Sequence, residues 1–276
     1  MNKRKNIFKA ACIQLNSNND MIKNIETSIN LIDLAISEKA DFIFLPENSS
    51  MMEWGKKNIV SSAMSEDDHI ALRAYKKIAR ENSIWLNCGS LTILLNDGSI
   101  VNRSYLINSS GEVNSYYDKI HMFDVDLGNG RTYSESSTYT PGKFLSVSST
   151  PWGKVGLTIC YDLRFPYLYR DIAKLGAKMI CVPSAFTLVT GKAHWHTLLR
   201  ARAIETGAFI FAPAQVGDHP GERQTYGHSL IVDPWGYVLA DAGPSSNIIF
   251  SEIDIEKSDI ARKKIPSLSY DKNYKF

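Results

Sequence analysis

One cysteine stands where a predicted strand gives way to a predicted helix. The run 155–159 is short, apolar and partly β-branched, which is typical of a buried strand, and Cys160 follows it directly. Residues 167–175 then carry apolar side chains at helical spacing. A cysteine at such a junction can be a nucleophile, because the amides at a helix N-terminus favour a thiolate. A free cysteine is more often a small buried apolar residue, so this segment alone leaves both interpretations open.

Two other ionisable residues also follow predicted strands. Glu47 comes after the apolar run 41–45 and a proline, and Lys119 comes after the predicted strand 113–117. Active sites of α/β proteins collect where strands end, which favours a functional role for both residues. Each could equally be a solvated surface residue, the usual place for a glutamate or a lysine.

The elements that must position these residues alternate along the whole chain. Apolar periodicity predicts helices over 19–39, 67–82, 167–175 and 193–206, and strands over 7–15, 41–45, 84–95, 101–108, 113–117, 145–148, 154–159, 178–182, 209–214, 228–232, 237–240 and 248–253. The polar stretch 124–140 predicts a long ordered loop, and such loops are often functional. Because no flexible linker interrupts this order, we expect one α/β domain over 1–276, with two sheets covered by helices, a core at about 7–266 and a C-terminal tail at 267–276.

Composition argues against several classes of partner. The 276 residues carry 31 Lys and Arg against 29 Asp and Glu without a long basic run, so we expect no nucleic-acid partner. The basic N-terminus is followed by a segment too short and polar for a signal peptide or a membrane span, so we expect no membrane association. The four cysteines form no CxxC pair, which favours a reducing cytoplasm over a disulfide framework.

Taken together, three segments form one ordered pattern. They are Phe-Leu-Pro-Glu at 44–47, Asp-Lys-Ile-His at 118–121 and Gly-Leu-Thr-Ile-Cys-Tyr-Asp-Leu-Arg-Phe-Pro at 156–166. In this order and at this spacing the chain resembles the nitrilase, or carbon–nitrogen hydrolase, superfamily from about residue 7 to about residue 266. The resemblance implies a single-domain α-β-β-α sandwich. It also implies a catalytic triad of Glu47, Lys119 and Cys160, with Glu135 as a second, supporting glutamate.

The chemistry that the resemblance implies is amide hydrolysis through a thioester, with no metal and no cofactor. Cys160 would attack the amide carbonyl, and Glu47 would move the proton from the thiol to the leaving amine and later activate water. Lys119 and the backbone N–H of Tyr161 would stabilise the oxyanion. Glu135 would keep Lys119 charged and oriented.

Motifs in the second half resemble the Nit branch of the superfamily. They are Thr-Gly-Lys-Ala-His-Trp at 190–195, Arg-Ala-Ile-Glu-Thr at 202–206 and Tyr-Gly-His-Ser at 226–229. This branch implies hydrolysis of the amide of deaminated glutathione to 2-oxoglutarate and cysteinylglycine. Three alternatives stay open: an ω-amidase acting on α-ketoglutaramate or another small linear amide, a nitrile hydrolase, and a non-catalytic scaffold. The family usually assembles as dimers or larger, so we expect a homodimer or a larger homo-oligomer.

Three residues outside the triad are candidates for binding the substrate. Arg164 could bind a substrate carboxylate or form a structural ion pair, and Phe186 and Tyr133 could line the pocket or belong to the core. His194 and His196 are two residues apart on a predicted helix and so point in nearly opposite directions, which argues against their sharing a metal ion.

Two histidines and one tyrosine are expected to surround the triad without taking part in the chemistry. His121 and His228 fit packing or supporting roles better than a catalytic base, because Glu47 already fills that role. Tyr167 replaces a glutamate that the family often has after Arg-Phe-Pro, which puts in doubt any subunit contact inferred from that glutamate.

Overall fold

The computed structural model describes residues 6–128 and 132–272. Its α-helices are α1 (Met21–Ser37), α2 (Lys56–Ser62), α3 (Ile70–Asn82), α4 (Pro166–Lys174), α5 (Leu188–Thr206) and α6 (Glu256–Lys264). Short 3₁₀ turns are η1 (Glu135–Ser137), η2 (Cys160–Arg164) and η3 (Ser267–Ser269).

Two large sheets contain most of the strands. The first has the order β17-β1-β2-β3-β5-β4, with β6 also pairing β5; its strands are β1 (Ile7–Gln14), β2 (Phe42–Phe44), β3 (Trp85–Asn87), β4 (Leu91–Leu94), β5 (Ile100–Ile107), β6 (Val113–Asp118) and β17 (Asn247–Asp254). The second has the order β16-β15-β12-β11-β10-β9; its strands are β9 (Ser146–Thr150), β10 (Gly153–Leu157), β11 (Ala177–Cys181), β12 (Phe209–Ala212), β15 (Leu230–Val232) and β16 (Val238–Asp241).

The centre of each sheet is parallel. In the first sheet β2 lies between β1 and β3 and runs parallel to both, and in the second sheet β11 lies in the same way between β10 and β12. Two small hairpins complete the strands: β7 (Asp124–Asp126) with β8 (Thr132–Ser134), and β13 (Val216–His219) with β14 (Arg223–Tyr226).

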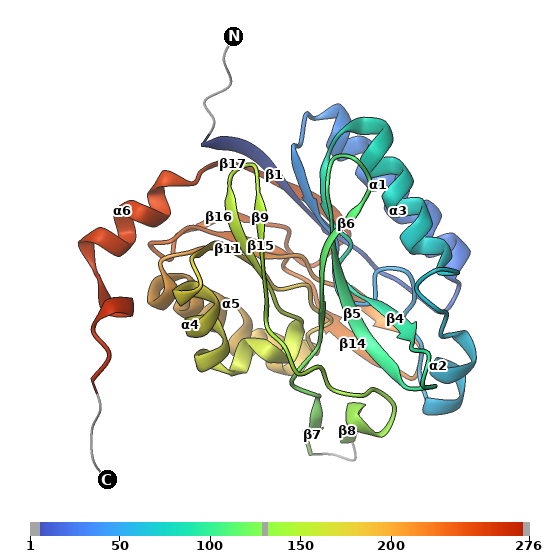
Figure 1. Ribbon diagram of the computed structural model, residues 1–276. Coiled ribbons are helices and arrows are strands. Elements are labelled where there is room, and N and C mark those ends of the chain that lie inside the picture. Colours follow the sequence, from blue (N-terminus) through green and yellow to red (C-terminus); the bar gives the residue numbers. More distant parts are fainter. Residues whose placement is uncertain (1–5, 129–131, 273–276) are drawn as a thin grey trace.

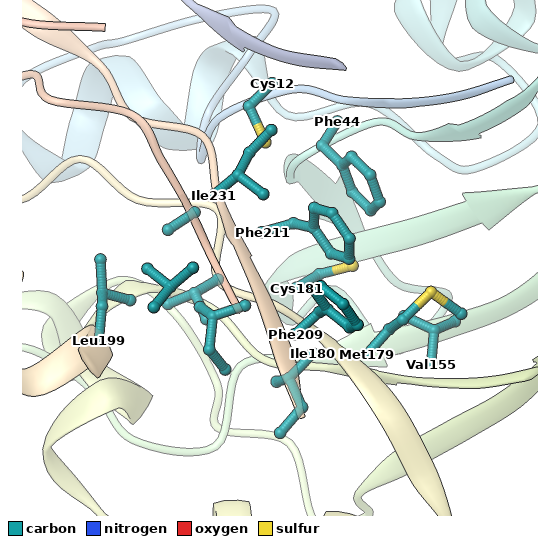
Figure 2. Close-up of a cluster of buried hydrophobic side chains, with 14 of the residues drawn as sticks. Cys12, Phe44, Val155, Met179, Ile180, Cys181, Leu199, Phe209, Phe211 and Ile231 are labelled. Carbon is teal, nitrogen blue, oxygen red and sulfur yellow. The ribbon is translucent and has the colours of Figure 1, made fainter. Parts of the chain in front are cut away.

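The two sheets pack face to face, and helices cover their outer faces (Figure 1). Phe44 of β2 stacks on Phe211 of β12 with ring centroids 4.4 Å apart, and Figure 2 shows the apolar layer between the sheets in which these rings lie. On the outer face of the first sheet, α1 and α3 bury Ile32 and Tyr75. On the outer face of the second sheet, α4 and α5 bury apolar side chains such as Leu199. The predicted α-β-β-α sandwich is therefore confirmed.

Several predicted boundaries were wrong. The run 84–95 is two strands, because the chain turns at Gly89, which has φ +71°. Helix α5 begins at Leu188, five residues before the predicted start at 193. Helix α2 was not predicted, and because it buries none of its residues it leaves no apolar periodicity to detect. The predicted loop 124–140 contains the β7–β8 hairpin and η1.

The described part of the C-terminal tail lies against α4. Asp271 forms ion pairs with Arg170 and Lys174, and Arg170 also donates to the Ser267 carbonyl at 2.9 Å. The tail residues Tyr274 and Phe276 lie outside the described residues, and the division into a core at 7–266 and a tail stays a prediction. Among residues 6–128 and 132–272, none of the helices has the length and apolar character needed to cross a bilayer.

Candidate active site

Glu47 is buried just after β2, at the edge where the parallel strands end. Its Oε1 accepts hydrogen bonds from Lys119 Nζ and Asn102 Nδ2, both at 3.0 Å, and its Oε2 accepts one from the Ala185 N–H at 2.8 Å. Gly89 packs against the preceding proline so closely that a Cβ there would lie 1.9 Å from the Pro46 carbonyl oxygen. Because glycine has no Cβ, the turn between β3 and β4 can lie directly against the loop that carries Glu47.

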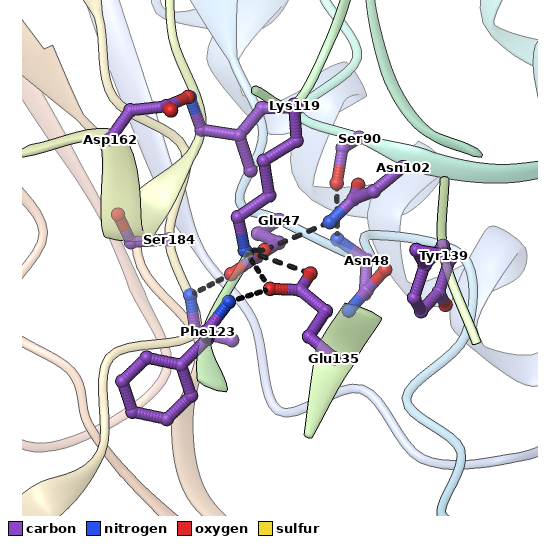
Figure 3. A network of polar contacts seen from close by, with 12 residues as sticks. Glu47, Asn48, Ser90, Asn102, Lys119, Phe123, Glu135, Tyr139, Asp162 and Ser184 are labelled. Carbon is purple, nitrogen blue, oxygen red and sulfur yellow. Dashed lines mark hydrogen bonds and ion pairs between the residues drawn. The ribbon is translucent and has the colours of Figure 1, made fainter. Parts of the chain in front are cut away.

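Lys119 lies between two glutamates, and Figure 3 shows the resulting network. Besides Glu47, its ammonium contacts both carboxylate oxygens of Glu135, at 2.8 and 2.9 Å. Glu135 begins η1 and also accepts a hydrogen bond from the Phe123 N–H at 2.6 Å. Burial lowers the pKa of Lys119, but the charges of Glu135 and Glu47 outweigh it, so the pKa lies above its ordinary value. The lysine is therefore charged.

Cys160 follows the strand β10 and begins η2. Its φ of +49° is unusual for a residue with a side chain, and its N–H donates to the Pro183 carbonyl at 3.0 Å. The thiol and the Glu47 carboxylate lie close enough to shift each other's pKa. Burial raises the pKa of the Cys160 thiol and the charge of Glu47 raises it further, whereas Lys119 and the Ala185 N–H lower it only in part.

These effects together favour the thiol over the thiolate at Cys160, which agrees with the expectation that Glu47 takes the proton from a thiol. Burial also raises the pKa of Glu47, but the positive charges of Lys119 and Arg223 and hydrogen bonds from Lys119 and Cys160 bring it below the ordinary value. At neutral pH the pair is a thiol next to a carboxylate. This arrangement places a proton acceptor against a nucleophile that needs one.

Asp162 connects the turn of Cys160 to the segment that follows Lys119. It is fully buried, and its Oδ2 accepts hydrogen bonds from the Ile159 N–H at 2.9 Å and the Tyr117 hydroxyl at 2.8 Å. Its Oδ1 lies 2.6 Å from His121 Nδ1, and the other ring nitrogen of His121 lies 2.6 Å from the Tyr167 hydroxyl. His121 thus supports this turn, and Tyr167 supports His121.

We expect Asp162→Asn to lower kcat by about 10²-fold, because an amide has one accepting oxygen and cannot serve both the donors of Ile159 and Tyr117 and the N–H of His121, so the turn of Cys160 moves. The free energy of unfolding should fall by about 1–3 kcal/mol. Steady-state kinetics below the melting temperature and thermal unfolding measure the two effects. The control is Tyr167→Phe, which removes a hydroxyl from a residue that is 58% exposed and should cost no more than about 0.5 kcal/mol. Equal losses of kcat in both variants would contradict the positioning role of Asp162.

A cavity of about 280 Å³ opens above these groups. Its lining brings together seven of the predicted site residues, namely Glu47, Lys119, Tyr133, Glu135, Cys160, Tyr161 and Phe186. Tyr133 comes from β8, so the segment 124–140 does contribute to this cavity, whereas Tyr161 comes from η2.

Arg164 is the predicted site residue that the structure does not bring into the cavity lining. Its guanidinium lies over the Phe186 ring at 5.1 Å and the Tyr161 ring at 5.8 Å, and it contacts His194 Nδ1 at 3.3 Å. The cavity contains a different arginine, Arg223 of β14, which sequence reasoning missed. Nothing in the local sequence around Arg223 distinguishes it from a surface arginine.

Asn102 is a second residue that sequence reasoning missed. It is buried within β5 and donates a hydrogen bond to Glu47. Its amide side chain inside a largely apolar strand is a signal that the sequence alone offers. Trp54 and Phe123 also line the cavity, and both contact the ring of Tyr133.

One group of side chains has the composition of a metal site. His196 Nε2 lies 3.0 Å from Asp241 Oδ2, and His228 Nδ1 lies 2.9 Å from Asp241 Oδ1. None of the three lines the cavity, and each histidine already pairs with the carboxylate. His194 points elsewhere, toward Arg164, as the spacing of the two helix histidines predicted.

The chain matches the family model described as carbon–nitrogen hydrolase over residues 9–263. It is 39% identical over 285 residues to the deaminated glutathione amidase of Dictyostelium discoideum, an alignment that covers 100% of this chain and 97% of the relative. It is also 39% identical over 268 residues to the nitrilase and fragile histidine triad fusion protein NitFhit of Caenorhabditis elegans, covering 95% of this chain. The chain spans only 60% of the length of that fusion protein.

Solved structures give the same result. The crystal structure of C. elegans NitFhit superposes with a TM-score of 0.90 at 38% identity, covering 96% of this chain and 65% of that one. Nit3 of Saccharomyces cerevisiae, described as a member of branch 10 of the nitrilase superfamily, superposes with a TM-score of 0.85 at 29% identity, covering 95% of each chain.

Proposed function

Because the chain belongs to the carbon–nitrogen hydrolase family, we propose that it is a cysteine-dependent amidase acting on deaminated glutathione. The observation that carries this proposal is the thiol of Cys160 beside the Glu47 carboxylate in the cavity that also contains Lys119. The substrate is proposed because relatives that are 37–39% identical over nearly the whole chain bear the name deaminated glutathione amidase. The products are 2-oxoglutarate and cysteinylglycine.

In the first half of the proposed reaction, Cys160 Sγ attacks the carbonyl carbon of the amide as its proton passes to Glu47. The negative charge that develops on the carbonyl oxygen is stabilised by the Lys119 ammonium and the N–H of Tyr161. Glu47 then gives the proton to the departing amine, the C–N bond breaks, and the acyl group stays on the sulfur as a thioester.

In the second half, Glu47 takes a proton from water, which attacks the thioester. The tetrahedral intermediate collapses, the C–S bond breaks, and the sulfur recovers a proton from Glu47. Glu135 acts through Lys119, whose ammonium it holds with two short contacts at 2.8 and 2.9 Å. These steps need no metal ion and no organic cofactor.

Two further proposals concern the surroundings of the enzyme. All four cysteines are free and buried, which supports a reducing cytoplasm. We also propose a homodimer or larger homo-oligomer, supported by large apolar side chains on the surface such as Val189 and Ile204 of α5, which are 64% and 52% exposed.

The test of the substrate is steady-state hydrolysis of deaminated glutathione and of α-ketoglutaramate, each followed as 2-oxoglutarate released. We expect kcat/KM to be at least about tenfold higher for deaminated glutathione, which corresponds to about 1.4 kcal/mol of transition-state discrimination. The opposite preference would identify an ω-amidase, and faster acid formation from a nitrile would identify a nitrile hydrolase. Turnover that Cys160→Ala leaves unchanged would contradict the cysteine mechanism.

A further inference from the structure

We infer that Arg223 is a substrate-binding residue that holds the carboxylate of the acyl group while Cys160 attacks the amide carbonyl. The inference rests on the proposed function and names the residue that selects 2-oxo acid amides. Arg223 belongs to β14 and lines the same cavity as Cys160, Glu47 and Lys119.

The guanidinium of Arg223 is held by one hydrogen bond to the backbone, and its Nε has no hydrogen-bond partner. One nitrogen, Nη2, donates to the Ala185 carbonyl at 2.7 Å, and the guanidinium carbon lies 5.9 Å from the centre of the Tyr133 ring. Nε is buried and has no hydrogen-bond partner. A buried donor without a partner is costly, and a guanidinium presents its donors in a fork that matches a carboxylate.

The charges in the cavity also leave Arg223 without an anion. Lys119 already contacts both Glu47 and Glu135, at 3.0 and 2.8 Å. In the described part of the chain no Asp or Glu forms an ion pair with Arg223, although its charge acts on Glu47 from a distance. A substrate carboxylate in the cavity would supply the missing anion for this guanidinium.

Deaminated glutathione has two carboxylates, and the position of Arg223 favours the one on the acyl group. Ala185 binds Arg223 through its carbonyl and Glu47 through its N–H, so the guanidinium lies close to the carboxylate that serves Cys160. The acyl group stays on the sulfur as a thioester, whereas the larger peptide must leave toward solvent. Four carbon–carbon bonds separate the acyl carboxylate from the attacked carbonyl, roughly 5 Å when extended, which suits two sites in one small cavity.

The experiment compares Arg223→Met with the unmodified protein on three substrates. α-Ketoglutaramate carries only the acyl carboxylate, deaminated glutathione carries both carboxylates, and 4-oxopentanamide has a methyl group in place of the acyl carboxylate. We expect kcat/KM to fall by about 10²–10³-fold for the first two substrates and to stay within about threefold for the third. The neutral substrate controls for any effect of the lost charge on Glu47.

Lys192 of α5 supplies the control, because it is an exposed lysine that does not line the cavity. Lys192→Gln should change kcat/KM for α-ketoglutaramate by less than about threefold, since a solvated cation contributes little. An equal loss on all three substrates in Arg223→Met would show that the arginine is structural or acts through Glu47. A loss confined to deaminated glutathione would assign Arg223 to the glycine carboxylate. Either result, or no loss, overturns the inference.

A binding measurement separates this inference from the proposed function. Titration calorimetry of 2-oxoglutarate with the Cys160→Ala protein needs no turnover, and adding Arg223→Met should weaken Kd by at least about 30-fold. If the unmodified protein hydrolyses neither anionic amide, the proposed function fails. The calorimetric difference still decides the role of Arg223, and an unchanged Kd overturns it.

Discussion

Replacing Cys160 with alanine is expected to lower kcat for amide hydrolysis by about 10⁶-fold, and adding Glu47→Gln to that variant is expected to lower it no further. When two residues act in the same step, replacing one also removes the contribution of the other to kcat. Here the proton acceptor Glu47 has no role once the nucleophile is gone. Glu47→Gln alone should cost about 10²–10⁴-fold, the usual contribution of a general acid–base. Single-turnover assays of the three variants measure these losses.

Alkylation by iodoacetamide separates the roles of Glu47. The carboxylate raises the pKa of the Cys160 thiol, so Glu47→Gln should lower that pKa and leave labelling at pH 7 at least as fast as before. Hydrolysis should still fall, because iodoacetamide needs no protonated leaving group, whereas amide cleavage does. Labelling that slows in proportion to hydrolysis would contradict this division of roles.

The motifs that predicted the site lie in segments whose local structure follows from the sequence. Glu47, Lys119 and Cys160 each follow a strand that its own apolar pattern predicts, and the sandwich brings these strand ends together. Glu135 lies in a polar stretch without periodicity, and it was predicted only through the resemblance. The structure gives it a clear contact with Lys119.

The difference between Arg164 and Arg223 could not be predicted, because it depends on packing between segments far apart in the chain. Arg164 follows Cys160 closely, yet η2 directs its side chain over Phe186 and toward His194. Arg223 reaches the cavity because the β13–β14 hairpin places it beside Ala185, a contact across 38 positions. Residue type and spacing contain no information on such side-chain directions.

Lys119→Met should be the most destabilising of these substitutions, by about 3–5 kcal/mol, because it removes the ammonium that pairs with the buried carboxylate of Glu47 and the partly buried carboxylate of Glu135. The same change should lower kcat by at least about 10²-fold through loss of oxyanion stabilisation. Thermal unfolding and steady-state kinetics measure the two effects. Lys178→Met is the matched control, because Lys178 forms a more exposed ion pair with Asp259 at 2.6 Å that should contribute no more than about 1 kcal/mol.

The pH dependence of this destabilisation has a definite sign. In the unmodified protein the pKa of Glu47 is lowered, so its contribution to stability is present above the ordinary value of 4.5 and is lost as the pH falls through the lower, folded value. Without Lys119 the burial of Glu47 is no longer offset by the charge of that lysine, so the pKa of Glu47 rises, and the penalty is present at neutral pH and fades as Glu47 takes up a proton. The difference in Tm between the unmodified protein and Lys119→Met should therefore be larger at pH 8 than at pH 5. A difference that is the same at both values would mean that lost packing, and not the unpaired carboxylates, causes the destabilisation.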